Sequence, residues 1–342
     1  MRVVRWLLLA PLLVVVALLL PVAFVETACR PVGEAVPYAS LVDPEHRRPE
    51  GRTLLTYPEW HVVHAYDDYA ATVAGGDPHD FRFLSAVAGF WSSTCALSRA
   101  SGAHGGFPWA TKQMVYVVGV SFSAEMLLKA LYEETLGRAA TWVRGQARAP
   151  LDDLSADQAA AYAAFLRQVP WYRWDFRADA AALDAAATGA FRDRERALAL
   201  GLENRAKALY ARAIAAAVAG VGADALSMRV VVAGLAPEAL EAAGARVVAR
   251  RPEGVEVETP RYRAFTDLAR VLARQGGEFV EIAGNDEIML TALTDGPEEL
   301  GALARFPRQG HGGYRHLLLL PVAELADALR DPRLAVEQVH DY

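Results

Sequence analysis

The feature that most constrains this chain is an uncharged run of twenty residues near its N-terminus. Residues 6–25 read WLLLAPLLVVVALLLPVAFV, and they follow Arg2 and Arg5. A helix of that length spans about 30 Å, which matches the hydrocarbon core of a bilayer. The run therefore predicts a transmembrane helix. A helix in a soluble core would need protein on all of its sides.

The residues after the run favour an uncleaved signal anchor over a cleaved signal peptide. The run exceeds the roughly 7–15 apolar residues of a signal peptide. Glu26 also stands three positions before Cys29, where a lipoprotein signal needs an apolar residue. The two arginines before the run outnumber Arg30 just after it, so the positive-inside rule keeps residues 1–5 in the cytoplasm. We expect a single-pass protein of a bacterial inner membrane with the bulk of the chain in the periplasm.

Composition limits the classes of partner. The 342 residues carry a formal net charge of −6, and no run of five or more like charges occurs. A nucleic-acid-binding protein shows a clustered basic surface, so no nucleic acid is expected as a partner. The membrane, reached through residues 6–25, is the expected partner. A protein partner or a homo-oligomer stays open.

The chain has two cysteines, Cys29 and Cys95. An oxidising compartment such as the periplasm allows such a pair to form a disulfide. Cys95 also falls on an apolar stripe with helical spacing, formed by Phe81, Leu84, Ala88, Trp91 and Cys95 itself. A buried free thiol is therefore the alternative, because the sequence does not give the distance between the sulfurs.

The rest of the chain divides by its hydrophobic period, and the fold class it predicts is α+β. Residues 26–55 contain four prolines and predict a linker or an extended segment that wraps around the protein. Helical spacing dominates residues 56–222, where Thr56 and Pro58 predict the first turn of a helix. Residues 226–342 predict strands and short helices that begin in the order β-α-β-β-α-β. This order predicts a ferredoxin-like core with an extension, and no internal repeat is strong enough to indicate duplication.

Residues 114–132 are hydrophobic enough to raise the alternative of a second membrane span. Polar side chains recur there every four residues, at Ser121, Glu125, Lys129 and Glu133. Glu125 and Lys129 stand in the favourable i,i+4 order on a helix. Because a charged pair that faces lipid is costly, we expect an amphipathic helix buried in the protein.

The densest group of reactive side chains lies in TYPEWHVVHAYDDYA, residues 56–70. At about 100° per residue, His61, His64 and Asp68 share one side of a helix, opposite the valines and most of the tyrosines. We therefore expect these three residues on an outward, solvated or domain-facing surface. His61 and Asp68 are about 10.5 Å apart along the axis, too far to share one tetrahedral ion. Only the pairs His61/His64 or His64/Asp68 can bind a divalent metal, with further ligands from elsewhere. His46, His79, His104 and His311 are the candidates for these further ligands.

The motifs of common catalytic sites are incomplete in this chain. HGGF at 104–107 and HGGY at 311–314 resemble the oxyanion loop of esterases, but no G-x-S-x-G nucleophile accompanies them. AGND at 283–286 combines residues that tolerate positive φ, which predicts a hairpin turn. The sequence also lacks HExxH, CxxC and P-loop motifs, so no catalytic residue is predicted.

Several stretches together resemble a group of uncharacterised bacterial membrane-anchored proteins with no known activity. These stretches are TYPEWHVVHAYDDYA, FWSSTCAL, TKQMVYVVGVSFSAEMLLKALYEETLGR and FVEIAGND. The resemblance does not indicate which activity, cofactor or site residues this chain has. We expect a membrane-anchored periplasmic protein of binding, assembly or scaffold type. The alternative is a metal-dependent or small-molecule-binding enzyme that uses the helix of His61 and His64.

Overall fold

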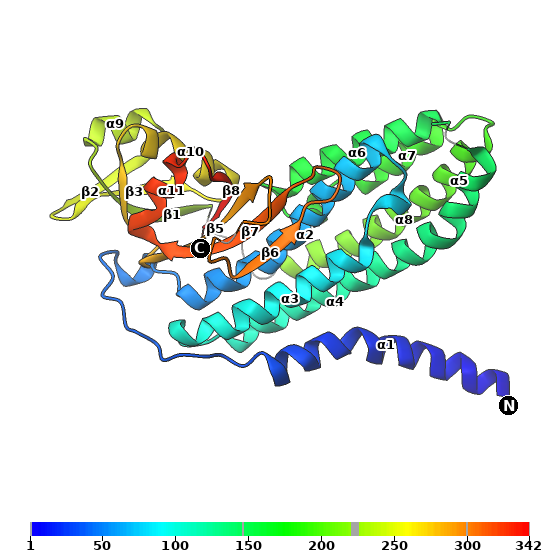
Figure 1. Ribbon diagram of the computed structural model, residues 1–342, viewed down its shortest axis with the longest axis horizontal. Coiled ribbons are helices and arrows are strands. Elements are labelled where there is room, and N and C mark those ends of the chain that lie inside the picture. The colour runs from blue at the N-terminus through cyan, green and yellow to red at the C-terminus, as the bar shows by residue number, and fades with distance from the viewer. Residues whose placement is uncertain (1, 146, 220–225, 299, 342) are drawn as a thin grey trace.

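Helices form the N-terminal part of the molecule and two small sheets form the C-terminal part (Figure 1). The structure is a computed structural model that describes residues 2–145, 147–219, 226–298 and 300–341. The helices of the first part are α1 (Arg2–Ala28), α2 (Glu50–Gly75), α3 (Phe83–Ala100), α4 (Trp109–Tyr132), α5 (Arg138–Arg144), α6 (Pro150–Leu166), α7 (Phe176–Ala186) and α8 (Phe191–Val218). The predicted end of the helical domain at residue 222 lies outside the described residues.

The C-terminal part is made of two four-stranded antiparallel sheets, so the predicted α+β class is confirmed. The first sheet contains β1 (Ser227–Ala233), β2 (Arg246–Arg251), β3 (Gly254–Pro260) and β4 (Glu278–Ile282), with α9 (Pro237–Ala242) and α10 (Arg263–Arg274) between them. The second sheet contains β5 (Glu287–Thr294), β6 (Ala304–Pro307), β7 (Tyr314–Pro321) and β8 (Ala335–His340), with α11 (Leu325–Arg330) before β8.

The two sheets have the same strand order, which the sequence does not reveal. The first sheet runs β2-β3-β1-β4 and the second runs β6-β7-β5-β8, so each strand of one has a counterpart in the other. Both also shift register at equivalent places, between Val231 and Val232 and between Thr291 and Ala292. Topology can repeat without sequence similarity because a strand requires only the right alternation of apolar side chains.

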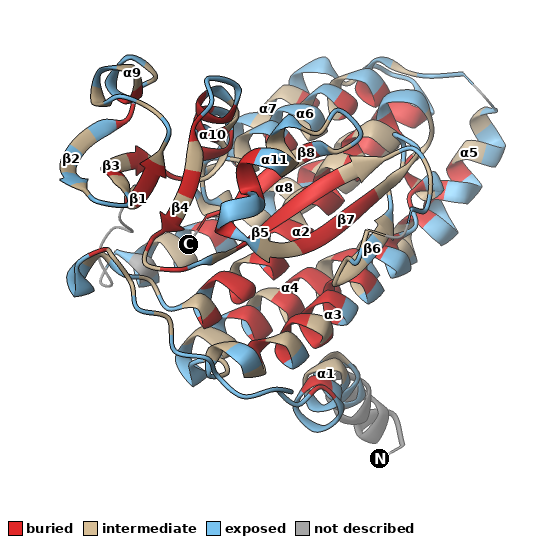
Figure 2. Ribbon diagram, turned by 60° about the vertical axis from the view of Figure 1, so that its left-hand side comes forward, coloured by how far each residue is buried: buried red, intermediate tan, exposed pale blue. Residues whose placement is uncertain are grey.

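The second sheet is covered on both faces. On one face, Leu290, Leu318 and Val339 join the core that α10 and α11 share with the first sheet. On the other face, Met289 and Leu317 pack against the first turns of α2. Figure 2 shows the resulting red, fully buried stretches along β5 and β7 above the helices. A sheet buried on both faces needs apolar runs rather than strict alternation, as in EIMLTALT of β5.

α2 lies at the centre of the molecule because protein covers both of its long sides. Ala65, Tyr66 and Ala70 face the core of the helical part. Leu54 and Tyr57 face the second sheet. A helix that is buried all round does not need one clear apolar stripe, which explains the weak amphipathicity of this segment.

α2 begins at Glu50, six residues before the predicted start at Thr56. The Thr56 hydroxyl donates to the carbonyl of Thr53 at 2.7 Å, within the helix, and does not cap a new one. Pro58 accordingly lies inside the helix rather than in its first turn. The predicted linker 26–55 therefore consists of the end of α1, an extended segment and the first turns of α2.

Among the described residues, one helix is long and apolar enough to cross a membrane by its length and composition. It is Trp109–Arg144, which joins α4 to α5 through a π-helical turn at Glu133–Gly137. Leu13–Ala28 of α1 is a shorter apolar helix. The inner side of α4 is buried through Val115, Phe122 and Met126, as expected for an amphipathic helix.

Candidate functional site

The helix side that carries His61, His64 and Asp68 faces the second sheet and not solvent. The three residues are 7%, 5% and 6% exposed. The expectation of a solvated face is wrong for these residues, whereas the domain-facing alternative describes their position. The reason is that β5 and β8 pack on this side of α2, while the opposite side packs on other helices. A helical pattern shows which side is polar but not which partner covers it.

His61 has a structural partner. Its Nε2 lies 2.9 Å from the carbonyl oxygen of Ala86, so it donates a hydrogen bond to α3. Its ring meets the edge of Phe306 on β6, with centroids 5.0 Å apart. Burial lowers the pKa of His61 to about 4, although the bond to Ala86 opposes this shift. The neutral imidazole of His61 therefore connects α2 to α3 through its hydrogen bond and to the second sheet through its ring contact.

Arg315 of β7 is the centre of a buried charged network under α2. It donates to both carboxylate oxygens of Glu337 on β8, at 2.5 and 3.0 Å. Its Nη1 lies 3.5 Å from Asp68, whose other oxygen accepts from the backbone N–H of Gln309 at 3.1 Å. His64 Nδ1 lies 3.6 Å from Glu337. The network therefore links α2 to β7 and β8 by opposite charges in a place without solvent.

The ionisation of this network follows from burial and from Arg315. Burial alone would raise the pKa of Glu337, but the hydrogen bonds and the positive charge of Arg315 reverse the effect and hold that pKa below its usual value. Burial raises the pKa of Asp68, and Arg315 offsets only part of the rise. Burial, reinforced by Arg315, lowers the pKa of His64 well below its usual value. The positive charge of Arg315 thus faces an ionised Glu337 and neutral imidazoles.

Three aromatic or imidazole side chains beside the network keep polar atoms without a protein partner. Tyr57 Oη, His64 Nε2 and both ring nitrogens of His340 are buried and make no hydrogen bond within the described part of the chain. The rings are neighbours, with Tyr57 and His340 centroids 5.4 Å apart and His64 and His340 centroids 6.4 Å apart. Most buried polar groups in proteins have a partner, so this cluster is the most unusual polar feature of the helix–sheet junction.

The rim of the junction brings together a set of possible metal ligands. Ligand atoms of Asp67, Asp68 and His311 lie within 4.8 Å of one another. Sequence reasoning included Asp68 and named His311, from the HGGY turn, among the histidines that could complete such a site, but it missed Asp67, which is one residue away on the helix. His61 is not a member of this group because its Nε2 is bonded to Ala86. Carboxylate and imidazole donors of this kind suit a divalent cation.

A second polar cluster joins the start of α2 to the β4–β5 turn. His104 of the HGGF loop lies between two carboxylates, with Nδ1 2.9 Å from Glu50 and Nε2 3.2 Å from Glu287. The hydrogen bond to Glu50 raises the pKa of His104, and burial opposes the shift. Burial and the neighbouring Glu50 also raise the pKa of Asp286. The Asp286 carboxyl therefore keeps its proton to a higher pH than an exposed aspartate does.

The extended segment before α2 is held by one buried carboxylate, Glu281 of β4. Its oxygens accept hydrogen bonds from the Tyr38 hydroxyl at 2.8 Å and the Ser40 hydroxyl at 2.9 Å. They also accept from the backbone N–H groups of Leu41 at 2.7 Å and Val42 at 2.9 Å. Glu281 is fully buried. The segment that the sequence indicates as a linker is therefore a fixed strap across the C-terminal part.

The predicted hairpin turn of AGND also contributes to this junction. Ala283 and Gly284 have φ of 51° and 88°, as such a turn requires. Asn285 is buried, and its side-chain amide donates to the carbonyl of Arg48 at 2.7 Å. The turn therefore holds the strap as well as connecting β4 to β5.

The last turn of α1 is joined covalently to α3. The structure contains a disulfide between Cys29 and Cys95. Val25 and Cys29 are completely buried. Glu26 forms an ion pair with Lys112 of α4 at 2.6 Å. These contacts fix the direction in which α1 leaves the helical part.

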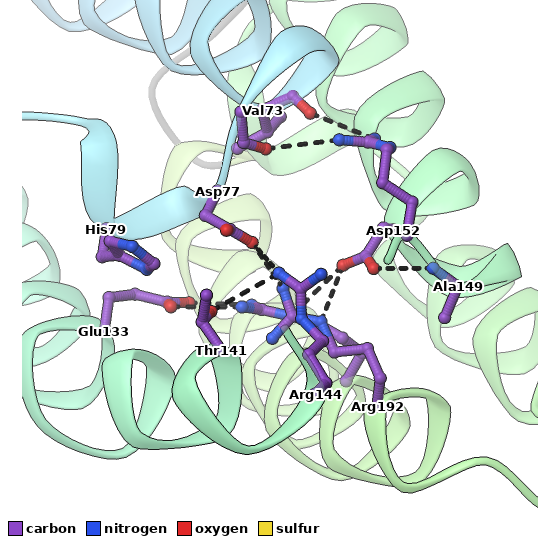
Figure 3. A network of polar contacts seen from close by, with 12 residues as sticks. Val73, Asp77, His79, Glu133, Thr141, Arg144, Ala149, Asp152 and Arg192 are labelled. Atoms are coloured by element: carbon purple, nitrogen blue, oxygen red, sulfur yellow. Dashed lines mark hydrogen bonds and ion pairs between the residues drawn. The ribbon is translucent and has the colours of Figure 1, made fainter. Parts of the chain in front are cut away.

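A further charged network lies at the C-terminal end of α2, among the helices of the helical part (Figure 3). Arg192 of α8 donates to Asp152 at 2.8 Å and to Asp77 at 3.2 Å. Arg144 of α5 also donates to Asp77. Each of these charges faces an opposite charge, so the network binds α5, α6 and α8 to the end of α2.

No family model, curated protein or solved structure matches this chain.

Proposed function

We propose that this chain is a single-pass, membrane-anchored periplasmic protein of a bacterial inner membrane. Residues 6–25 of α1 hold it in the bilayer, and the helical part and the sheets bind or assemble with other components outside the cytoplasm. A protein partner or a second copy of the chain is the component that this role implies. No reaction is assigned to the site.

The observation that carries this proposal is the attachment of α1. The Cys29–Cys95 disulfide and the Glu26–Lys112 ion pair lie directly after the apolar run. Disulfides persist in oxidising compartments, which supports the periplasmic side for the domains that follow. A fixed attachment also ties the helical part to the end of α1, which a flexible tether would not do.

The arrangement of the C-terminal part supports a binding role. The order β1-α9-β2-β3-α10-β4 with strands ordered β2-β3-β1-β4 fits a ferredoxin-like unit, and β5 to β8 are its extension. Polar residues of the most distinctive sequence stretches hold the C-terminal part in place. Asp68 of α2 accepts from Gln309 of the β6–β7 turn, and Glu281 and Asn285 bond the extended segment before α2. Because these polar side chains are engaged in structural hydrogen bonds, they favour a binding or assembly role over a catalytic one.

Fusions of alkaline phosphatase after residues 30, 105 and 225 test the topology. The enzyme needs an oxidising compartment, so all three fusions should be active if the proposal holds. Inactivity of all three would contradict it. Activity after residue 105 with inactivity after residue 225 would instead place residues 114–132 across the membrane.

One observation favours a second candidate function, which is metal binding at the rim of the helix–sheet junction. The convergence of Asp67, Asp68 and His311 supports it. Elemental analysis of purified protein and of Asp67→Asn should then show a divalent metal in the first and its loss in the second. Asp153→Asn on exposed α6 surface is the control and should keep the metal. Absence of metal from the parent protein after exposure to divalent cations would reject this function.

A further inference from the structure

A cleft with a volume of about 400 Å³ opens where the C-terminal end of α2 meets the start of α3 and the β6–β7 turn. Among its lining residues are Gly75 of α2, Arg82 just before α3, and Arg308 of the turn. It is here named the Arg82–Arg308 cleft. Small-molecule sites in proteins have volumes of about 300–1,000 Å³, so this cleft is large enough to bind a ligand.

The walls of the cleft are fixed by contacts between its three segments. The side-chain oxygen of Gln309 accepts from the backbone N–H of Arg82 at 2.6 Å, and the backbone N–H of Gln309 donates to Asp68 at 3.1 Å. Gly310 has a φ of 74°, and a Cβ at this position would lie only 2.5 Å from the backbone nitrogen of Thr72. The β6–β7 turn therefore packs closely on α2, which holds the two arginines of the cleft at a fixed spacing.

The guanidinium groups of Arg82 and Arg308 are both unpaired. Among the described residues, neither side chain forms a hydrogen bond or an ion pair, although the Nε of Arg308 is buried. Arg144, Arg196 and Arg229 also have a buried nitrogen without a partner, but other nitrogens of these groups are paired. Arg308 differs from them because its whole guanidinium lacks a protein partner. Most buried polar groups have one, so a ligand is the expected partner here.

The carboxylates that Arg308 influences are already bonded to another arginine. Arg308 helps to lower the pKa of Glu337 and limits the rise in the pKa of Asp68, so both carboxylates lie in its vicinity. Neither of them forms an ion pair with Arg308, whereas Arg315 contacts them at 2.5 and 3.5 Å. The charge of Arg308 is therefore available on the side of the cleft.

The remaining charges around the cleft favour a negatively charged ligand. Asp80 is the one acidic lining residue in the described part of the chain, and it accepts from the backbone N–H of Asp77 at 2.9 Å. Carbonyl groups at the end of a helix oppose an anion. At the end of α2, however, Arg148 donates to the carbonyls of Val73 and Gly76, at 3.3 Å each. Two unpaired positive charges thus face one engaged negative charge.

We propose that the Arg82–Arg308 cleft binds a small molecule through an oxyanion group, either a carboxylate or a phosphate. A guanidinium has parallel N–H donors that match two oxygens of such a group. Gly75 leaves room for the rest of the ligand, because a Cβ at this position meets no atom within 4 Å. This site goes beyond the proposed function and does not depend on α1 as an anchor.

Isothermal titration calorimetry of the full chain in a neutral detergent tests this inference. The probes are citrate and inorganic phosphate, each in a buffer without other oxyanions. We expect saturable binding of at least one probe. Arg308→Gln should bind it about ten-fold more weakly, because a charge-assisted contact is lost. Arg212→Gln, which removes an exposed arginine of α8, is the control and should bind as the parent protein does.

Gly75→Leu tests the cleft without removing a charge. The new side chain would fill open space in the cleft and should also weaken binding about ten-fold, whereas Gly189→Leu, at another open position, should not. Circular dichroism shows whether each variant is folded, and Gly75→Leu decides the question if Arg308→Gln is not. Binding of citrate alone assigns a carboxylate to the site, and binding of phosphate alone assigns a phosphate. Absence of saturable binding of either probe, or binding that Gly75→Leu leaves unchanged, overturns the inference without bearing on the membrane anchor.

Discussion

Arg315 lies where the carboxylates of α2 and β8 meet. It is 2% exposed and contacts Glu337 and Asp68, and His64 lies 3.6 Å from the same carboxylate of Glu337. A buried charge is tolerated only while its partners remain, because unpaired charges in a dry site are costly. Loss of the Arg315 side chain should therefore lower the free energy of unfolding more than loss of an exposed arginine.

Arg315→Met should lower the free energy of unfolding by about 3–5 kcal/mol, the cost of breaking a buried ion pair. The remaining Glu337 and Asp68 would be left without their counter-charge. Urea unfolding followed by fluorescence measures the change. Arg333→Met, which removes an exposed arginine paired with Asp331, is the control and should change little. Equal effects of the two variants would mean that the buried network does not hold the junction.

His104 should make stability depend on pH near neutrality. Its pKa is raised in the folded protein, mainly by the hydrogen bond to Glu50. The stabilisation is therefore fully present below the unfolded pKa of about 6.5 and is lost as pH rises through the higher folded pKa. The stability difference between parent protein and His104→Gln should be about 1 kcal/mol larger at pH 6 than at pH 9, given screening at the partly exposed Glu287.

Denaturant unfolding at the two pH values measures this difference. Glu287→Gln leaves Glu50 in place and should remove only part of the pH dependence. A stability difference that grows with pH would contradict the assignment of His104 as the charged bridge.

Individual site residues were predictable only in part. Helical spacing correctly grouped His61, His64 and Asp68 on one side of α2, since that depends on local geometry alone. Their burial was not predictable, because strands far along the chain cover that side. Arg315, Glu337 and His340 belong to strands whose alternation predicts secondary structure but no contact with α2. His311 was visible in HGGY, yet its meeting with Asp67 depends on the tertiary fold.

At the scale of elements, the strap before α2 corresponds to the extended alternative for this segment, but its attachment to the C-terminal part could not be predicted. Four prolines and mixed charges are typical of a linker, and the segment is indeed extended. It is nevertheless fixed, because Glu281 supplies acceptors for two backbone N–H groups and two hydroxyls. The sequence EFVEIAG predicted the strand that carries Glu281 but gave no reason to expect a polar side chain to be satisfied by a distant segment.

Glu281→Gln should release the strap without unfolding the sheets. Loss of the charge weakens several charge-assisted hydrogen bonds, so we expect a cost of about 2–3 kcal/mol. Hydrogen exchange should show faster exchange of the Leu41 and Val42 amides, with β1 and β3 unchanged. Glu278→Gln, on the same strand and half-exposed, is the control. Unchanged protection of both amides in Glu281→Gln would show that other contacts hold the strap.

The strands and helices were predicted far better than the start of α2 or the equivalence of the two sheets. Alternation and helical periods identify elements because they follow from local geometry. The start of α2 was misplaced because Thr56 and Pro58 have the signature of a first turn, yet the chain is already helical before them. The repeated strand order was hidden because each sheet keeps only a pattern of apolar positions, in different residues.

At the scale of the whole molecule, α1 is joined to the helical part by a disulfide, and the two sheets are fixed on that part by buried charges. The parts are connected at several places: Cys29–Cys95, His104, Glu281 and Arg315. Such connections suit a protein whose parts keep a fixed arrangement. The rim of the helix–sheet junction is one surface that this arrangement holds in place.

The most direct test of the central claim is the side of the membrane on which the helical part lies. Ala160→Cys places a thiol on exposed α6, and a membrane-impermeant maleimide is added to intact spheroplasts of cells that express the full chain. The account predicts labelling without lysis, with the labelled protein retained in carbonate-washed membranes. Labelling that requires lysis, or release of the protein by carbonate, would contradict a periplasmic protein anchored by α1.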